Sequence, residues 1–314
     1  MAKSSRSSVR LSVSKTDAAT PHTRKSRAVL SHHARVRRLL CLAVLLLAAQ
    51  AYPQFSNPEF PDPGKPGMSR EEQRKIGLQA AAQVYQQMPV LPDSSAETKY
   101  VRQLGEKLVA TIPPEYSWPF EFHVVAQKEI NAFALPGGPM FINTGLLKAV
   151  DNEAQLAAVM GHEMSHVILR HGTNQASKAK LIELPAMLAG QLAGNSMLGQ
   201  LEQVGIGLGA NSVLLKFSRS AESQADLMGS HIMAEAGYDP VEMAKFFDKL
   251  NSKGGAPPEF FSDHPNPDNR SKAIELEAER LPQQDYGYQT GQFQQMKKVV
   301  GTIKEPPPKR PSSQ

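Results

Sequence analysis

The chain has 314 residues, of which 40% are hydrophobic, and it contains one cysteine. This length suffices for one large domain or two small ones with a buried core, and a lone cysteine excludes an intramolecular disulfide framework and any cysteine-based zinc or iron–sulfur site. The formal net charge is +5, but residues 1–38 contain ten basic residues and one acidic residue, so the remainder carries −4. The positive charge therefore belongs to the N-terminal segment, and it does not predict a nucleic-acid partner.

This N-terminal segment is typical of an export signal. Basic residues ending at Arg38 precede the apolar run 39–49, which is too short to span a bilayer as an ordinary helix and fits the hydrophobic region of a signal peptide. We predict a signal peptide with a long basic lead over residues 1–51, cleavage after Ala51 in the small-x-small site Ala49-Gln50-Ala51, and a periplasmic location. Cys41 lies at the start of the apolar run, which argues against a lipoprotein. An uncleaved membrane anchor is the alternative.

Two helices and two strands are expected in the first part of the mature chain. Residues 52–68 are rich in proline and glycine and predict an extended linker. Ser69 is placed to cap a helix with acidic residues in its first turn, and a second helical pattern covers residues 96–112. Residues 120–125 alternate with period two, which predicts a half-buried strand, and residues 140–143 form a second short strand after a turn. We expect this second strand to be a sheet edge along which an extended substrate lies, with a plain structural strand as the alternative.

The rest of the chain is predicted to be helical. Residues 151–171 have a strong helical pattern, with Gly172 placed as its stop. The apolar, glycine-interrupted stretch 181–215 predicts helices that cover the core or flank a cleft, with membrane association as the alternative. Further helices are expected over residues 220–236, over residues 241–250 and up to about residue 280. The fold class is therefore α+β, mostly helical with a small sheet; the domain covers 69–282, and a largely disordered tail covers 283–314.

The segment from Gly161 to His166 contains the pattern His-Glu-x-x-His inside the helix predicted over residues 151–171. His162 and His166 are one turn apart on the same helix face, so both imidazoles can reach one metal ion. Glu163 is offset by about 100° and can address a water molecule beside that metal. A buried helix with two histidines and a glutamate requires partners for these groups, because buried polar groups are costly unless paired. A catalytic metal site is the interpretation that provides them.

A third metal ligand is expected from another helix, because a catalytic zinc site has three protein ligands and an open position. Glu222 and Asp226 are one turn apart on the helix predicted over residues 220–236. Glu222 can complete the ligand set, and Asp226 can accept a hydrogen bond from the outer ring nitrogen of His162. We therefore predict one Zn²⁺ per chain, although a His₂Glu site can also hold neighbouring metals.

These motifs together resemble the gluzincin metallopeptidases of family M48, the Ste24/OMA1/HtpX-like group. The resemblance extends over about residues 70–280 and rests on four further segments, namely Asn131–Gly138, Thr144–Leu147, Ala221–Asp226 and His264-Pro265 with Arg270. It implies a soluble, exported zinc endopeptidase with a zincin-like fold, in which the active-site helix packs beside a small sheet. It also implies unfolded or misfolded envelope proteins as substrates.

The resemblance implies a hydrolytic mechanism. Zinc lowers the pKa of water to about 7 and polarises the substrate carbonyl, and Glu163 is the general base and then the general acid. Two other functions are open: a latched, chaperone-like zinc protein that binds envelope clients with little cleavage, and a zinc aminopeptidase. The oligomeric state and any peripheral membrane association are open as well.

Three further residues have less specific signals. His264 is placed either to stabilise the oxyanion or to occupy the open zinc position as a latch, and a fourth protein ligand would switch the enzyme off. Arg219 is a candidate site residue that could hold a substrate carboxylate or the oxyanion, with a structural ion pair as the alternative. His171 is expected to be a charge near the C-terminal end of the zinc helix.

Overall fold

The computed structural model describes residues 63, 67–175, 177, 217–252, 260–261, 264–265, 269–288 and 290–304. These residues all belong to the second of two compact units, residues 59–314. The predicted signal peptide, most of the predicted linker and the stretch 181–215 lie outside the described residues. Among the helices that are described, none is long and apolar enough to cross a membrane.

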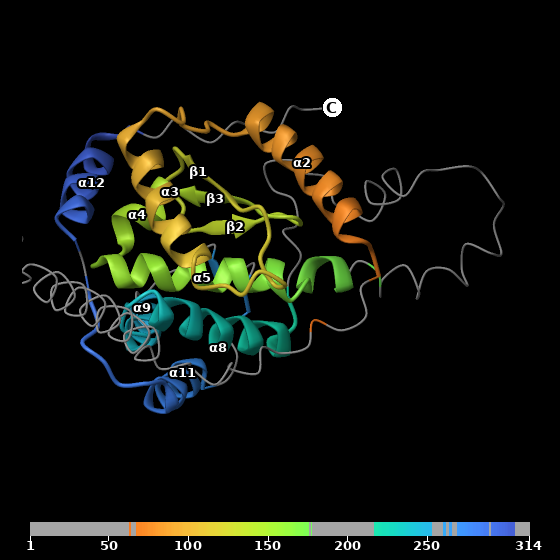
Figure 1. Ribbon diagram of the computed structural model, residues 1–314. Coiled ribbons are helices and arrows are strands. Elements are labelled where there is room, and N and C mark those ends of the chain that lie inside the picture. The colour runs from red at the N-terminus through yellow and green to blue at the C-terminus, as the bar shows by residue number, and fades with distance from the viewer. Residues whose placement is uncertain are drawn as a thin grey trace, which may run out of the picture. The chain divides into compact units, whose positions relative to one another are not determined.

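A small sheet of three strands lies at the centre of the described chain (Figure 1). The strands are β1 (Glu121–Val125), β2 (Ala132–Ala134) and β3 (Pro139–Asn143). β3 pairs in parallel with β1 and antiparallel with β2, so the order is β1-β3-β2. The expectation that β3 is a sheet edge is therefore wrong, because its backbone groups are paired on both sides. Within the described residues, β2 is the outer strand that contacts helix α5 (Glu153–Ile168), which contains the His-Glu-x-x-His pattern.

The prediction that β1 is half-buried is also wrong, because both of its faces are covered. Phe122 and Val124 belong to the main core, whereas His123 on the opposite face is only 6% exposed. The His123 ring lies 5.0 Å from the ring of Phe141, and its Nδ1 is 2.9 Å from the hydroxyl of Tyr85. Tyr85 comes from helix α2 (Arg70–Gln87), which covers this face of the sheet. A polar residue at an alternating position is thus buried by tertiary packing.

We expect His123 to make the folded protein less stable at acidic pH. Burial lowers the pKa of His123 below its ordinary value of 6.5, although the carboxylates of Asp93 and Glu121 oppose this shift. Because the folded pKa is the lower one, the unfolded chain binds the proton more readily, and stability decreases as the pH falls below about 6.5. Urea unfolding at pH 5 to 8 should show a shallower loss of stability on acidification for His123→Phe than for the wild type. Parallel pH profiles would contradict this assignment.

The first two helices begin at the predicted positions. Ser69 caps α2 in a capping box with Glu72, and Ser95 caps α3 (Ala96–Val109), whose expected end was three residues later. Each cap satisfies a backbone N–H group that has no partner inside the helix. Helix α3 lies against β1, and the short helix α4 (Thr144–Ala149) follows β3 directly.

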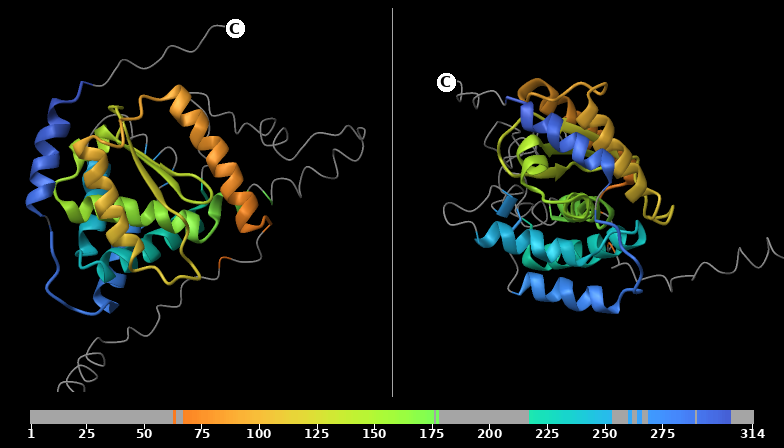
Figure 2. Two further views of the ribbon diagram at one scale, coloured as in Figure 1. Left: turned by 45° about the horizontal axis from the view of Figure 1, so that its top comes forward. Right: turned by 90° about the vertical axis from the view of Figure 1, so that its left-hand side faces the viewer.

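Helix α5 (Glu153–Ile168) is buried along its whole length between the sheet and helix α8 (Arg219–Glu235), as Figures 1 and 2 show. Two glycines allow the two helices to approach closely. A Cβ atom on Gly229 would lie 2.9 Å from the backbone nitrogen of His162, and one on Gly161 would lie 3.1 Å from the carbonyl oxygen of Gly229. This close approach brings the first turns of α8 next to the histidines of α5.

The end of α5 differs from the prediction. The helix ends at Ile168, and Arg170 adopts a left-handed backbone conformation with φ of 57°. A new helical turn then covers residues 171–175, so Gly172 lies inside it and is not the stop. The reversal at Arg170 changes the direction of the chain and places the next residue, His171, against the end of α5.

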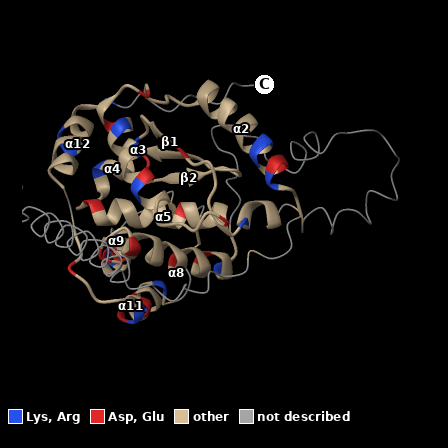
Figure 3. Ribbon diagram, in the orientation of Figure 1, with Lys and Arg blue, Asp and Glu red and all other residues tan. Residues whose placement is uncertain are grey.

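The C-terminal helices pack against different parts of the fold. Helix α9 (Val241–Ser252) lies against α5, and helix α11 (Arg270–Arg280) lies against both α8 and α9. Helix α11 carries both acidic and basic residues (Figure 3). Helix α12 (Gly291–Thr302) packs against α3 and α4 through Phe293, Met296 and Val300. The expectation of a largely disordered tail is therefore wrong for this helix, which buries apolar side chains at intervals of three and four residues.

Candidate metal centre

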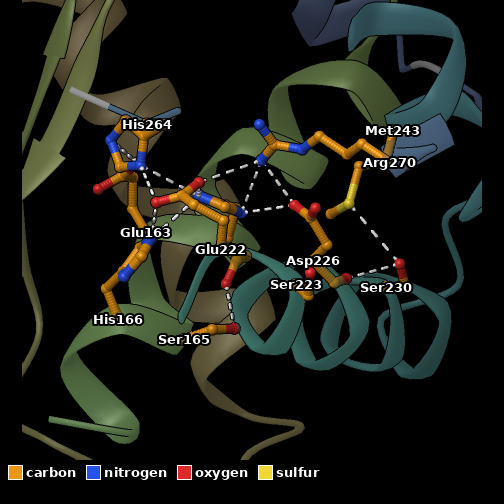
Figure 4. Close-up of polar contacts among 12 residues, drawn as sticks. Glu163, Ser165, His166, Glu222, Ser223, Asp226, Ser230, Met243, His264 and Arg270 are labelled. Carbon is orange, nitrogen blue, oxygen red and sulfur yellow. Dashed lines mark hydrogen bonds and ion pairs between the residues drawn. The ribbon is translucent and has the colours of Figure 1, made fainter. Parts of the chain in front are cut away.

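The two histidines of α5 meet as the helical spacing predicts. The Nε2 atoms of His162 and His166 are 3.0 Å apart, and both rings are buried. Glu222 reaches them from the first turn of α8: its two carboxylate oxygens lie 3.3 Å from Nε2 of His162 and 3.5 Å from Nε2 of His166. Figure 4 shows the side chains of His166 and Glu222 pointing toward one another. The structure thus brings together all three side chains that the sequence predicts as ligands.

His264 is the fourth member of this group. It comes from the segment after α9, and its Nδ1 atom lies 3.3 Å from Nε2 of His162 and 3.2 Å from Oε1 of Glu222. Its other ring nitrogen, Nε2, lies 3.2 Å from Oε1 of Glu163. One ligand atom each from His162, His166, Glu222 and His264 lies within 4.8 Å of the others, and all four residues are buried.

Asp226 lies behind His162, as expected. Its Oδ1 atom is 2.9 Å from Nδ1 of His162, so the carboxylate accepts the Nδ1 proton and leaves the Nε2 lone pair directed at the group. Arg270 of α11 donates to the same oxygen at 2.6 Å, and its guanidinium lies 3.7 Å from the centre of the Phe247 ring. Figure 4 shows Arg270 above Asp226 and Glu222. The positioning contact of Arg270 has no local pattern in the sequence that would predict it.

Of the two remaining residues for which the sequence makes a prediction, Arg219 lies outside the buried group and His171 lies against it. Arg219 is exposed at the first residue of α8, outside the buried group. His171 lies against His166, with 2.9 Å between the two Nδ1 atoms. Burial lowers the pKa of His171 to about 4, so the ring is neutral at physiological pH. The expectation of a helix-end charge is therefore wrong for this residue.

Burial and hydrogen bonds set the protonation states of the group. Burial lowers the pKa of His166 well below its ordinary value, so this imidazole is neutral. Burial opposes ionisation of Glu222, but hydrogen bonds with His162 and His264 hold the pKa of its carboxyl well below the ordinary value. Burial lowers the pKa of His162, but hydrogen bonds with Asp226 and Glu222 outweigh burial and raise this pKa above its ordinary value, so a metal ion that binds His162 displaces a proton. Deprotonated imidazoles and a carboxylate are donors that zinc accepts, at a spacing that one ion can bridge. The donor set therefore fits a divalent transition metal, which would remove the mutual repulsion of the converging lone pairs.

The chain is similar to several known proteases. The chain is 34% identical over 182 residues to the beta-barrel assembly-enhancing protease of Yersinia pestis, covering 55% of this chain and 37% of the relative. It is 31% identical over 246 residues to the protein of that name from Escherichia coli K12, covering 73% and 50%. It is 30% identical over 190 residues to the mitochondrial metalloendopeptidase OMA1 of Schizosaccharomyces pombe, covering 59% and 54%.

The chain thus spans about half the length of these curated relatives, or less. Residues 95–278 match Peptidase family M48, and this match contains the four members of the buried group as well as Glu163, Asp226 and Arg270. The matched residues make up more than half of the chain and include the sheet, helix α5 and helix α8. The chain therefore belongs to peptidase family M48.

Proposed function

We propose that this protein is a zinc-dependent endopeptidase. The observation that carries the proposal is the convergence of His162, His166 and Glu222. Glu163 is next to His162 on helix α5, and its carboxylate lies beside this group. A structural metal site needs no general base, whereas a hydrolytic site needs one beside the water molecule. The three ligands are assigned to His162, His166 and Glu222, and Asp226 is assigned to the hydrogen bond that orients His162.

Zinc, when bound, supplies a polarised water molecule and a Lewis acid for the substrate carbonyl. Glu163 accepts a proton from the attacking water and transfers it to the departing amide nitrogen, so that the peptide bond breaks without a covalent intermediate. Asp226 holds the Nδ1 proton of His162 in its hydrogen bond, and Arg270 donates to the same Asp226 oxygen at 2.6 Å.

The substrates are proposed to be unfolded or misfolded envelope proteins. Two relatives are named as a beta-barrel assembly-enhancing protease and a mitochondrial metalloendopeptidase, which supports protein substrates. In this proposal residues 1–51 are a signal peptide, residues 52–68 a linker, and residues 69–282 the peptidase domain, extended by α12. The mature protein then acts in the periplasm.

Cleavage of an unfolded protein before and after metal removal tests the function. We expect the zinc-loaded protein to cut casein. After a chelator has removed the metal, the cleavage rate should be at least 100-fold lower, and added Zn²⁺ should restore it. Blocked internal peptides distinguish an endopeptidase from an aminopeptidase, because only an endopeptidase cuts a substrate without a free amino terminus. A zinc-loaded protein that cuts neither casein nor blocked peptides, with or without His264, would refute the proposal.

His264 is proposed to be a latch on this site. A ring nitrogen of His264 lies close enough to the ligand atoms of the other three residues to bind the same metal ion. Its Nε2 atom is 3.2 Å from the carboxylate of Glu163, which must reach the water. A fourth protein ligand displaces the water and holds the enzyme inactive. We therefore expect His264→Ala to raise the initial rate of casein cleavage several-fold, measured at saturating zinc.

His231→Ala is a matched control for this experiment, because His231 pairs with Glu277 on α11, away from the metal group. A fall in rate for His264→Ala with normal zinc content would instead assign His264 to oxyanion stabilisation. An unchanged rate would exclude both roles.

A further inference from the structure

A chain of polar side chains leads from His166 away from the metal group. Nδ1 of His166 lies 2.9 Å from Nδ1 of His171, and the rings meet edge to face at 73°. Nε2 of His171 lies 3.1 Å from Oε1 of Gln224, an exposed residue of α8. The inner ring nitrogen of each histidine in α5 therefore faces the metal group, while the outer one has a defined partner.

The positions of the protons follow from these contacts. Oε1 of Gln224 can accept but not donate, so the proton of a neutral His171 lies on its Nε2 atom. Nδ1 of His171 then has a lone pair, and it accepts the Nδ1 proton of His166. Nε2 of His166 is left with a lone pair directed at the metal group. Asp226 produces the same result for His162 in one step, because a carboxylate only accepts.

The opposite arrangement would prevent ligation by His166. If residue 224 donated to Nε2 of His171, the proton of His171 would move to Nδ1 and point at His166. Nε2 of His166 would then carry a proton, and a protonated nitrogen cannot bind a metal ion. An acceptor at position 224 is therefore the choice that leaves both lone pairs available.

The surrounding structure holds this arrangement in place. In a continuous helix, a residue five positions after His166 would be rotated by about 140° from it, but the left-handed residue Arg170 turns the chain back. The ring of Phe217 stacks on a face of the His166 ring: the two ring centres are 3.8 Å apart, and the ring planes differ by 21°. The His166 ring is thus fixed by a stacked aromatic side chain and by one hydrogen-bond acceptor.

We propose that His171 and Gln224 are positioning residues that select the metal-binding tautomer of His166. This inference rests on the proposed function, in which His166 is a metal ligand, and it assigns to a neutral pair the role that Asp226 has for His162. Partners of this kind typically change metal affinity 10- to 100-fold when they are replaced, because they fix the ring orientation and the tautomer of the ligand.

Zinc affinity, measured by competition with a chromophoric chelator, tests the proposal. We expect His171→Phe to bind zinc about 10- to 100-fold more weakly than the wild type, since it keeps the aromatic packing but has no acceptor. Gln224→Met should also bind more weakly, whereas Gln224→Glu should bind at least as tightly as the wild type, because a carboxylate is a pure acceptor. Ser223→Glu places the same charge one residue earlier on the exposed surface and controls for long-range attraction.

The Gln224 variants keep the test decisive if His171→Phe fails to fold, because the side chain of Gln224 is exposed. Equal zinc affinities for Gln224→Met and the wild type would overturn the proposal, as would an effect of Ser223→Glu equal to that of Gln224→Glu. His166→Ala separates this inference from the proposed function. If His166→Ala loses zinc while the His171 and Gln224 variants bind normally, only the positioning role fails; if His166→Ala binds normally, the ligand assignment fails and the positioning role fails with it.

Ring nitrogen NMR of the zinc-loaded protein gives a readout that general destabilisation would not change. In ¹⁵N-histidine-labelled protein, we expect His171 to carry its proton on Nε2 and His166 to carry its proton on Nδ1. Replacing Gln224 with methionine should shift His171 toward a mixture of tautomers. A His171 ring protonated on Nδ1 in the wild type would overturn the proposal.

Discussion

Glu163→Gln should lower kcat for peptide hydrolysis by about 10²- to 10⁴-fold while leaving the zinc content unchanged. Glutamine has the shape of glutamate but cannot accept a proton from water, so the general base is lost. The ligand side chains of His162, His166 and Glu222 are untouched by this replacement. Initial rates on casein and the metal content of the same preparation, measured by elemental analysis, check both halves of the prediction.

Glu106→Gln is the matched control, because Glu106 is an exposed glutamate on α3. It should cleave casein at the wild-type rate. Equal cleavage by Glu163→Gln and the wild type would refute the assigned mechanism and point to another site or a contaminating protease. Loss of zinc in Glu163→Gln would show that the carboxylate helps to hold the metal.

Arg270→Met should destabilise the metal-free protein by about 3–5 kcal/mol. Arg270 is only 3% exposed and donates to Asp226 at 2.6 Å, and Oε2 of Glu222 lies 3.6 Å from the same nitrogen. Removing one partner of a buried ion pair leaves the other charge without compensation in a medium that solvates it poorly. Methionine fills a similar volume, so the loss reflects the missing charge more than a cavity.

Urea unfolding of the metal-free protein measures this effect without the stabilisation that bound zinc adds. Lys272→Met on the exposed face of α11 is the control and should change stability by less than about 0.5 kcal/mol. Adding Asp226→Asn to Arg270→Met should recover part of the loss, because the uncompensated carboxylate is removed. A double variant as unstable as the sum of both single variants would show that the two side chains act independently.

The helices near the site could be predicted because their signals are local. The caps at Ser69, the helical spacing of the histidines in α5 and the start of α8 near Arg219 all depend on residues within one or two turns. The burial of His123 and the packing of helix α12 on the core could not be predicted in this way. Both depend on packing against segments that are distant in the sequence, namely α2 for His123 and α3 with α4 for α12.

Some features of the candidate site could likewise be predicted from local sequence, whereas others depend on tertiary packing. The sequence by itself predicted that His162 and His166 share one helix face, because the helical repeat places residues four apart on one side. It also predicted that Glu222 and Asp226 join them from a second helix, and the structure brings these side chains together. It also indicated, through resemblance alone, that His264 belongs to the same group of side chains.

Only the tertiary structure decided which groups surround these ligands. Arg270 reaches Asp226 across 44 residues, and Gln224 reaches His171 across 53 residues. The close approach of α5 and α8 at Gly161 and Gly229 makes these contacts possible. Helical periodicity fixes the relation of residues within one element, whereas contacts between elements depend on how the elements pack, and no local pattern specifies that.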